Sequence, residues 1–169
     1  YLRRQPRPSH ADLVQLRKYG DNYDISGGGI ASGRMTVALV AAGVVAKQIL
    51  DGVTFNTQLV EVGGVSDKRQ FDDIIKAAAA EGNSVGGVVE CTISGIKEPL
   101  GEPFFDSVES VMSHLLFSIP GVKGVAFGDG FAAAAKRGSE RNDAIVDASG
   151  RTATNNEGGI NGGIANGND

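Results

Sequence analysis

His10 is the residue of this chain best suited to move a proton. It is one of only two histidines, and it follows a proline-fixed segment, with Arg7 before it and Asp12 after it. An imidazole ring changes its charge near neutral pH, so a histidine held in this way could serve as a general acid or base. The local sequence alone favours a simpler role, in which His10 only caps the start of a helix. The other histidine, His114, is expected on a helix at the surface or at an interface.

Two arginines are candidates for binding an anion. A planar guanidinium can hold two oxygens of a carboxylate or phosphate in parallel hydrogen bonds. Arg34 is the stronger candidate because it follows a glycine run at residues 27–33 and opens a predicted helix, whose first amides also attract anions. Arg7 is the second candidate. The alternative for Arg34 is an ordinary solvated arginine, which fits this setting poorly.

The glycine run imitates a phosphate-binding P-loop but departs from it. Residues 28–35 have Arg34 where a P-loop has lysine, and Met35 where it has the hydroxyl that binds Mg²⁺. A nucleotide triphosphatase is therefore a poor interpretation. A metal site is not expected either, because two distant histidines and one cysteine do not supply a ligand set. That cysteine, Cys91, lies on the apolar face of a predicted strand and is expected to pack in the core.

The elements that would position these residues are a mixture of helices and strands. Hydrophobic spacing and capping signals predict helices at residues 11–19, 32–50, 67–80 and from 106 onward, and a helical turn at 131–136. Asp106 and Glu109 have the spacing of a capping box. Alternating apolar residues predict strands at 53–60, 85–94 and 122–127, and a polar loop is expected at 21–29. The helix that contains the apolar run 37–46 is expected to be buried on most sides. This mixture predicts an α+β fold.

The composition is that of one soluble domain spanning residues 1–169. The chain has 41% hydrophobic and 21% charged residues, and its net charge of -4 argues against a dedicated nucleic-acid binder. The run at 37–46 is too short to span a bilayer, and the first residues show no apolar signal segment. A single cysteine agrees with a reducing compartment. We therefore expect a cytoplasmic protein that binds neither membranes nor nucleic acids.

Ordered blocks along the whole sequence resemble those of chorismate synthases. The family carries a PRPxHAD segment, which residues 6–12 match, and a glycine run leading into SxR, which residues 27–34 match. An AAGxxAKxxL helix matches residues 41–50, and a GEPFFDSxES block matches 101–110. Further blocks match residues 118–131 (SIPxVKGVxFGxGF), 138–143 (GSExND) and 154–167 (TNNxGGIxGGIxNG). So many blocks do not agree in order by chance, and the sequence is identified as a member of this family.

The resemblance implies a phosphate lyase of the shikimate pathway. The family removes phosphate and a proton from 5-enolpyruvylshikimate-3-phosphate in an anti 1,4-elimination that gives chorismate. It requires reduced FMN, with NADPH as a possible reductant, although the reaction has no net redox change. By this resemblance, His10 matches a histidine that acts as a proton donor close to the flavin. Arg7 and Arg34 match positions near the anionic small-molecule substrate.

The resemblance also implies flavin contacts, several of them from the main chain. The matching positions are Ile30, Ala31, Ser32, Pro120, Gly121 and Gly162. Family members usually have Arg or His at the position of Ile30 and commonly Ser or Phe at that of Ala31. One polar contact to the flavin is therefore expected to be lost in this chain.

The family fold is a β-α-β sandwich and the usual assembly is a homotetramer, so both are expected here, with the sandwich incomplete at both ends. Family enzymes are expected to be well over twice this length, and their further segments carry a second catalytic histidine, more substrate arginines and a flavin-binding Lys/Thr loop. The chain is thus expected to be a central portion or a truncated homologue. The alternative to an active enzyme is a truncated, inactive homologue that retains only flavin-binding or oligomerisation surfaces.

Overall fold

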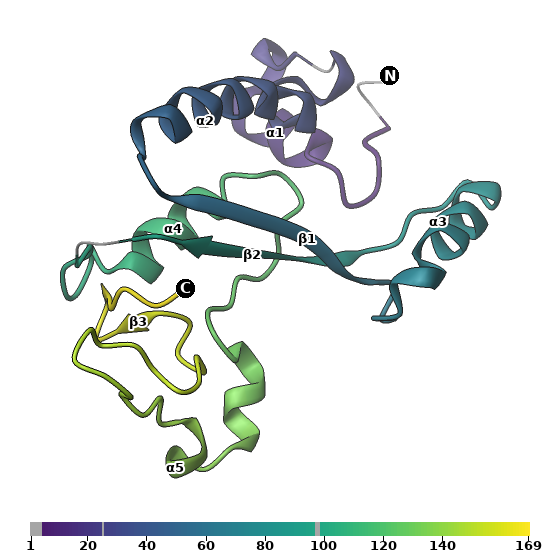
Figure 1. Ribbon diagram of the computed structural model, residues 1–169. Helices are drawn as coiled ribbons and strands as arrows, with labels where there is room; N and C mark the ends of the chain where they lie inside the picture. Colours follow the sequence, from purple (N-terminus) through teal and green to yellow (C-terminus); the bar gives the residue numbers. More distant parts are fainter. Residues whose placement is uncertain (1–4, 25, 97–98) are drawn as a thin grey trace.

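A computed structural model of the chain describes residues 5–24, 26–96 and 99–169. Its centre is a long antiparallel hairpin of β1 (Thr54–Val62) and β2 (Gly87–Ser94). The helices α1 (Asp12–Tyr19) and α2 (Val37–Ile49) lie on one side of this hairpin, and the C-terminal segments lie on the other (Figure 1). The predicted mixture of helices and strands is confirmed.

The central hairpin is regular over most of its length. Its register runs from the pair Thr54 and Ser94 to the pair Val62 and Gly87, with an irregularity between Leu59 and Glu61. The connection between the strands carries α3 (Phe71–Ala80) at the far end of the hairpin (Figure 1). Over the described residues this sheet has two strands, so one backbone edge of each strand has no sheet neighbour there.

The N-terminal helices follow the local signals in the sequence. Helix α1 ends at Gly20, whose φ of 57° is reached easily by glycine and whose N–H donates to the carbonyl of Leu16. Two 3₁₀ helices at Ser26–Ala31 and Gly33–Thr36 then lead into α2. The helices predicted at 11–19 and 32–50 are therefore confirmed. The loop predicted at 21–29 is largely 3₁₀ helix, and its Ile25 lies outside the described residues.

Helix α2 is exposed, which corrects the expectation that it would be buried on most sides. Val37, Val40 and Ile49 have exposed fractions of 71%, 66% and 77%. The helix is apolar around its whole circumference, which normally indicates a buried helix. Within the described part of the chain, no segment covers it.

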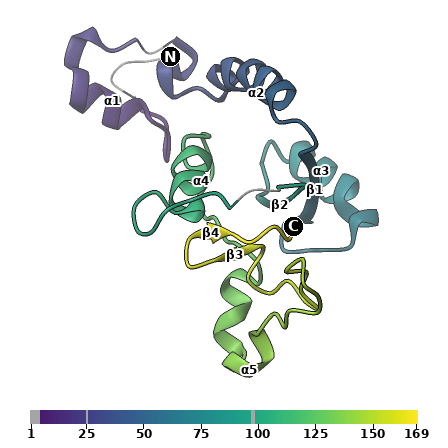
Figure 2. The ribbon, with the colours of Figure 1, turned by 60° about the vertical axis from the view of Figure 1, so that its left-hand side comes forward.

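The C-terminal part is held together by close backbone contacts. Helix α4 (Val108–Leu116) lies next to the hairpin of β3 (Ile160–Asn161) and β4 (Ile164–Ala165) (Figure 2). The N–H of Val108 donates to the carbonyl of Gly163 over 2.9 Å, and the N–H of Ala165 donates to that of Leu100 over 2.8 Å. A short helix α5 (Gly138–Arg141) and a 3₁₀ helix at Gly130–Ala135 complete this part.

Three further sequence expectations were wrong. Residues 122–127 form no strand, since no described segment pairs with them. Helix α4 is capped by Ser107, whose Oγ accepts from the N–H of Ser110, and not by Asp106. Cys91 is exposed instead of packed in a core, because the β2 face that carries it is uncovered; its Sγ accepts a hydrogen bond from the hydroxyl of Thr57. The helical turn expected at 131–136 is confirmed as the 3₁₀ helix Gly130–Ala135.

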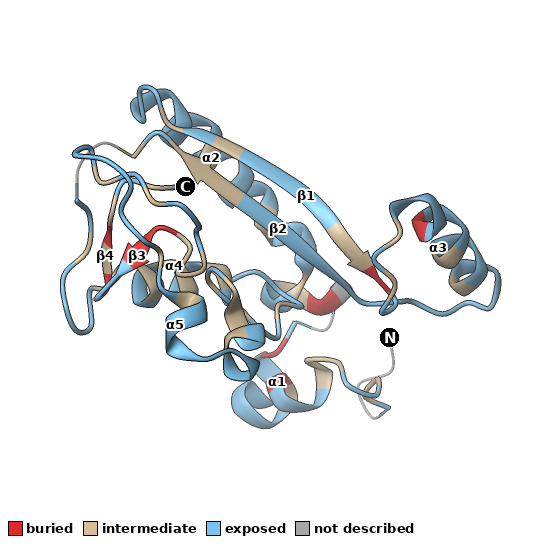
Figure 3. Ribbon diagram, turned by 60° about the horizontal axis from the view of Figure 1, so that its bottom comes forward, coloured by how far each residue is buried: buried red, intermediate tan, exposed pale blue. Residues whose placement is uncertain are grey.

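The chain has little hydrophobic core. The buried apolar residues of the described part are scattered in separate patches (Figure 3); they are Tyr23, Val62, Phe71, Ile160 and Ala165. The accessible surface is 12522 Å², whereas a compact protein of this mass would expose about 7,900 Å². In the part of the chain that the structure describes, no helix is both long and apolar enough to cross a membrane.

Candidate functional site

The strongest cluster of polar side chains forms around Asp12 at the start of α1. Its carboxylate accepts from Arg7 Nε over 2.7 Å and from Arg7 Nη2 over 2.8 Å, a bidentate ion pair. Nδ1 of His10 lies 2.8 Å from Oδ1 of the same carboxylate. The hydroxyl of Tyr23 donates to that oxygen over 3.1 Å. The PRPxHAD segment and Tyr23 therefore form one hydrogen-bonded unit, called the His10 cluster below.

The electrostatics of this unit keep Asp12 charged. Hydrogen bonding from the Arg7 side chain is the largest influence, and it outweighs burial and holds the pKa of Asp12 well below its ordinary value. Burial and the neighbouring carboxylate raise the pKa of the Tyr23 hydroxyl, which therefore stays protonated and able to donate. Asp12 is well covered, with a side-chain exposure of 14%, against 35% for His10.

The glycine run lies directly against His10. A Cβ atom added to Gly28 would lie 3.4 Å from Cε1 and 3.6 Å from Nε2 of the His10 ring, and 3.6 Å from Cβ of Ser32. Gly28 is buried and has a φ of 88°, a left-handed conformation in which a side chain would be strained. Two segments that the sequence separates by some twenty residues thus meet at the Cε1–Nε2 edge of the imidazole ring.

Arg34 lies on the same loop, folded back over it. Its Nη1 donates to Oγ of Ser32 over 3.2 Å, and its Nη2 lies 3.4 Å from the carbonyl of Ser26. The loop is tightened by Asp24, whose carboxylate accepts from the N–H of Ser26 over 2.9 Å. That backbone hydrogen bond lowers the pKa of Asp24. Arg34 is exposed, and its long hydrogen bonds are of the kind that an anion could displace.

The residues predicted to contact a flavin are distributed over separate segments. Ile30, 73% exposed, and Ala31 lie in the 3₁₀ helix beside Gly28, next to the His10 cluster. Pro120 and Gly121 form an exposed turn after α4. Gly162 forms the turn between β3 and β4, and this hairpin lies across the central sheet from α1 and α2 (Figure 1). The structure therefore brings His10, Ser32 and Arg34 together and leaves Gly162 apart from them.

Asp143 organises the glycine-rich C-terminal loop that carries Gly162. Its Oδ1 accepts from the hydroxyl of Thr154 over 2.7 Å and from the N–H of Asn156 over 2.8 Å, and its Oδ2 accepts from the N–H of Glu157 over 2.9 Å. Burial alone would raise the pKa of Asp143, but these hydrogen bonds outweigh it and lower the pKa to about 2. Neither Asp143 nor Asp12 was among the residues that the sequence predicted for the site.

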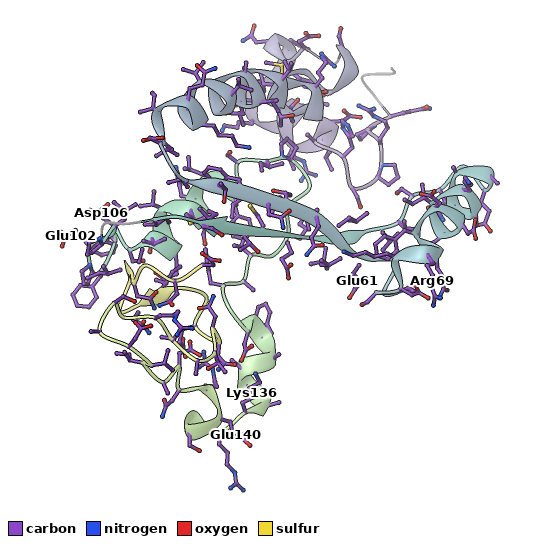
Figure 4. All side chains as sticks on the ribbon, viewed as in Figure 1. Glu61, Arg69, Glu102, Asp106, Lys136 and Glu140 are labelled. Carbon is purple, nitrogen blue, oxygen red and sulfur yellow. The ribbon has the colours of Figure 1, made fainter. Side chains whose placement is uncertain are left out.

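A separate cavity of about 360 Å³ opens beside this loop. Its lining includes Glu109, Phe127, Phe131, Glu157 and Ile160, and none of the predicted site residues borders it. Glu157 there is paired with Arg141 over 2.8 Å. Other charged side chains lie at the ends of the molecule: Figure 4 places Glu61 and Arg69 near α3, and Lys136 and Glu140 on the C-terminal part. Among the described residues, no group of three His, Cys, Asp or Glu side chains is arranged to hold a metal ion.

The model of the chorismate synthase family matches this chain over residues 1–169. The chain belongs to the chorismate synthase family. A chorismate synthase of Chitinophaga pinensis is 56% identical over 168 residues, covering 99% of this chain and 50% of the relative. A chorismate synthase of Pyrobaculum arsenaticum is 42% identical, with 95% of this chain and 51% of the relative covered.

The fold agrees with this family. A crystal structure of a chorismate synthase aligns with a TM-score of 0.77 at 27% identity, covering 90% of this chain and 57% of the other. The chain spans about half the length of the curated relatives it matches. The relatives are thus about twice as long, which corrects the expectation of well over twice.

The family match reaches all the blocks on which the sequence resemblance rested. Residues that the resemblance did not single out, Asp12 and Tyr23, turn out to hold His10 in place. A signal for Asp12 was present, since it stands two positions after His10 at the predicted start of a helix. No sequence signal indicated Tyr23, because its contact with Asp12 depends on the path of the chain after α1.

Proposed function

We propose that this protein catalyses the chorismate synthase reaction, the anti 1,4-elimination of phosphate from 5-enolpyruvylshikimate-3-phosphate. The observation that carries the proposal is the packing of the His10 cluster against the glycine loop, in a chain that belongs to this family. The two motifs that the resemblance assigned to proton transfer and to anion binding meet at one place. An acid–base residue next to a helix-start anion site is what an elimination of phosphate from an anionic substrate needs.

His10 is the proposed proton-transfer residue. Its Nδ1 faces the carboxylate of Asp12, and its Nε2 edge faces the glycine loop. Because the ring is fixed on one side, the proton that it exchanges is the one on Nε2. The side chain of His10 remains 35% exposed.

Arg34 and Arg7 are the proposed substrate-binding residues. Arg34 stands one residue after the first position of the 3₁₀ helix that opens α2, where backbone amides also attract an anion. Arg7 is already held by Asp12 through two hydrogen bonds, from Nε and from Nη2. We assign the main contribution to substrate affinity to Arg34, and to Arg7 a positive charge of fixed position beside His10.

The residues beside His10 fit a planar cofactor such as FMN. Ile30 and Ala31 are exposed on the loop that packs against His10 through Gly28. Ser32 adds a hydroxyl, and the turns at residues 120–121 and at Gly162 are equally open. Reduced FMN would lend electron density to the substrate, and NADPH could keep it reduced.

The exposed surfaces support a larger folded body than this chain alone. We propose that residues 1–169 belong to one domain, a β-α-β sandwich, in which α2 is covered by segments that the longer relatives also have. The support is the large accessible surface and the apolar circumference of α2. Association into a homotetramer in the cytoplasm is part of the same proposal.

The proposal is tested by titrating reduced FMN into the protein with and without 5-enolpyruvylshikimate-3-phosphate, followed by an assay for released phosphate. We expect the substrate to tighten flavin binding, and phosphate release to depend on both. Flavin binding without phosphate release would favour the alternative of an inactive homologue that keeps the flavin surface. Absence of any flavin binding would contradict the proposal for this chain.

A matched pair of variants tests the role of His10. We expect His10→Ala to lower turnover by about a hundredfold or more while it leaves flavin affinity within a fewfold of the original. His114→Ala is the control, because His114 lies exposed on α4. An equal loss of turnover and flavin affinity in His10→Ala would count against a proton-transfer role.

A further inference from the structure

The sequence Arg7-Pro8-Ser9-His10-Ala11-Asp12 folds back on itself so that three ionisable side chains converge. A turn at this point joins the N–H of His10 to the carbonyl of Arg7 over 3.3 Å, with Ser9 in the left-handed region at a φ of 55°. Asp12 then opens α1, where the helix dipole favours a negative charge. The start of the helix therefore favours the ionised form of Asp12.

The carboxylate of Asp12 is saturated with donors. Its Oδ2 accepts from Nε and from the backbone N–H of Arg7 over 2.7 and 3.2 Å. Its Oδ1 accepts from Nη2 of Arg7 and from the Tyr23 hydroxyl, and it lies 2.8 Å from Nδ1 of His10. A carboxylate with so many donors cannot rotate without losing several hydrogen bonds at once. Since Asp12 is ionised, it can only accept, and the nitrogen that faces it is required to donate.

The Arg7 side chain favours the opposite placement of the ring hydrogen, on Nε2 of His10. Nη2 of Arg7 lies 3.2 Å from the same Nδ1 and would donate to it if that nitrogen carried no hydrogen. Two features favour a hydrogen bond from Nδ1 of His10 to Asp12 over one from Arg7 to Nδ1. Its oxygen is nearer, at 2.8 Å, and Nη2 of Arg7 already donates to that oxygen over 2.8 Å. Among the described residues, the charged groups in contact with the ring are thus Arg7 and Asp12, and on its other edge the ring lies against Gly28, which Ser32 adjoins.

We propose that Asp12 is a positioning residue, which keeps a hydrogen on Nδ1 of His10 and so reserves Nε2, the nitrogen at the Gly28 edge, for proton exchange. When the imidazolium gives up the proton on Nε2, the ring becomes neutral with its remaining hydrogen still on Nδ1, donated to Asp12. Asp12 stays ionised throughout, and Tyr23 and Arg7 hold it in place. The part about proton exchange rests on the proposed function, whereas the part about the location of the hydrogen does not.

The location of the hydrogen can be read directly by NMR. In the protein with ¹⁵N-labelled histidine, long-range proton–nitrogen correlations distinguish a ring nitrogen that carries hydrogen from one that does not. The chain has only two histidines, so a His114→Gln variant assigns both sets of signals. In the neutral form of the ring, we expect Nδ1 to carry the hydrogen and Nε2 to be bare. The reverse pattern in the wild-type protein would overturn the proposal without any variant.

Variants then test whether Asp12 is the cause. We expect Asp12→Ala to shift His10 toward the form with hydrogen on Nε2 and to leave His114 unchanged. Asp67→Ala is the control, since Asp67 is also paired with an arginine, Arg69, but lies before α3. If Asp12→Ala disturbs the fold, Tyr23→Phe removes only one of the donors that hold Asp12. We expect this variant to shift the ring-nitrogen signals of His10 part of the way and to leave those of His114 unchanged. Unchanged His10 signals in both variants would contradict the proposal.

Activity provides an independent readout. In a preparation that releases phosphate, we expect Asp12→Asn to lower turnover about ten- to hundredfold, as loss of the partner that orients a histidine does elsewhere, with flavin affinity nearly kept. Asp12→Glu, which keeps a carboxylate, should retain part of the turnover that Asp12→Asn loses. If the wild-type protein releases no phosphate, the proposed function fails while the NMR result stands. If turnover is normal in Asp12→Asn, the positioning role fails while the function stands.

Discussion

At the residue scale, two aspartates organise the two ends of the chain. Asp12 holds Arg7 and His10 at the start of α1, and Asp143 holds the loop from Thr154 to Glu157. Each carboxylate accepts several hydrogen bonds, which lower its pKa. A short carboxylate is suited to this task because it can gather backbone and side-chain donors around one point.

The pH dependence of stability tests the role of Asp143. Its pKa of about 2 in the folded chain lies below the ordinary value, so its contribution is complete above about pH 4 and is lost as the pH falls toward 2. We expect Asp143→Asn to lower the free energy of unfolding by about 2 kcal/mol at pH 7, and the gap to the wild type to narrow below pH 4. Urea unfolding followed by circular dichroism measures it.

The control for Asp143 is Asp147→Asn. Asp147 is also hydrogen-bonded, to Ser149 and Arg151, but it is more exposed and solvent screens it. We expect a much smaller change for this variant, because solvent screens the interactions of an exposed carboxylate. A gap for Asp143→Asn that stays constant down to pH 2 would contradict the ionised role of that carboxylate.

Ile30 offers a second test at this scale. The resemblance predicts a basic residue at this position, and its side chain is 73% exposed, so an arginine fits without a clash. Because FMN is anionic, we expect Ile30→Arg to tighten FMN binding by about three- to tenfold. Ile145→Arg is the matched control, with an isoleucine of the same exposure, 73%. Equal tightening by both variants would mean general charge attraction, and weaker binding by Ile30→Arg would refute the idea.

Much of the candidate site could be predicted from sequence, but its supporting contacts could not. His10 and Arg34 belong to motifs, so the resemblance identified them without any geometry. Tyr23 supports Asp12 from eleven residues away, and Asp143 reaches a loop 11 to 14 residues further on. Such partners are set by how the chain turns between them, and short-range patterns carry no information about that path.

At the element scale, the structure agrees with local signals and departs where distant partners decide. Gly20 ends α1 and Asp67 accepts from the N–H of Arg69, as capping rules predict. The strand expected at 122–127 is absent because a strand needs a neighbour, and the described part of the chain supplies none. The apolar pattern of α2 is correct for a buried helix, but burial is again a property of what packs against it.

The contact between the β3–β4 turn and α4 gives the prediction at this scale. Gly163 has a φ of 85°, and a Cβ there would lie only 2.7 Å from Cβ of Ser107, the residue that caps α4. Gly162 next to it has a φ of 59° and open space around it. We expect Gly163→Ala to cost about 3 kcal/mol or more, from strain and the lost contact together, and Gly162→Ala about 1 kcal/mol from the backbone alone.

Thermal unfolding of the two glycine variants measures the difference. The pair is well matched, because both glycines are in one turn and both have left-handed backbones. FMN affinity separates their roles further, since Gly162 is the predicted flavin contact and Gly163 is buried against α4. Equal destabilisation by both substitutions would mean that the close approach to Ser107 contributes nothing.

At the scale of the whole molecule, the excess of accessible surface is the leading feature. The chain exposes roughly one and a half times the area of a compact protein of its mass. The N-terminal helices and the C-terminal segments lie on opposite sides of a two-stranded hairpin (Figure 1). A molecule of this shape gains stability chiefly by association with further protein, because its own core is small.

Helix α2 is the surface on which we expect such association to depend. Val40 and Val44 lie one turn apart on its face and are 66% and 57% exposed. If they are buried when copies of this chain associate, each contributes about 1.5 kcal/mol. Replacing both by lysine should therefore weaken self-association by on the order of a hundredfold, while the helix itself is kept because lysine is a good helix former.

Sedimentation velocity over a range of concentrations measures this effect. Val14→Lys is the control: Val14 is similarly exposed, at 61%, but lies on α1 among charged neighbours. A loss of association in the α2 variant alone would show that α2 forms the self-association surface, since charge added elsewhere would have no such effect. A wild-type chain that stays monomeric at high concentration would contradict a role of α2 in self-association, because a helix with so much exposed apolar surface is expected to associate.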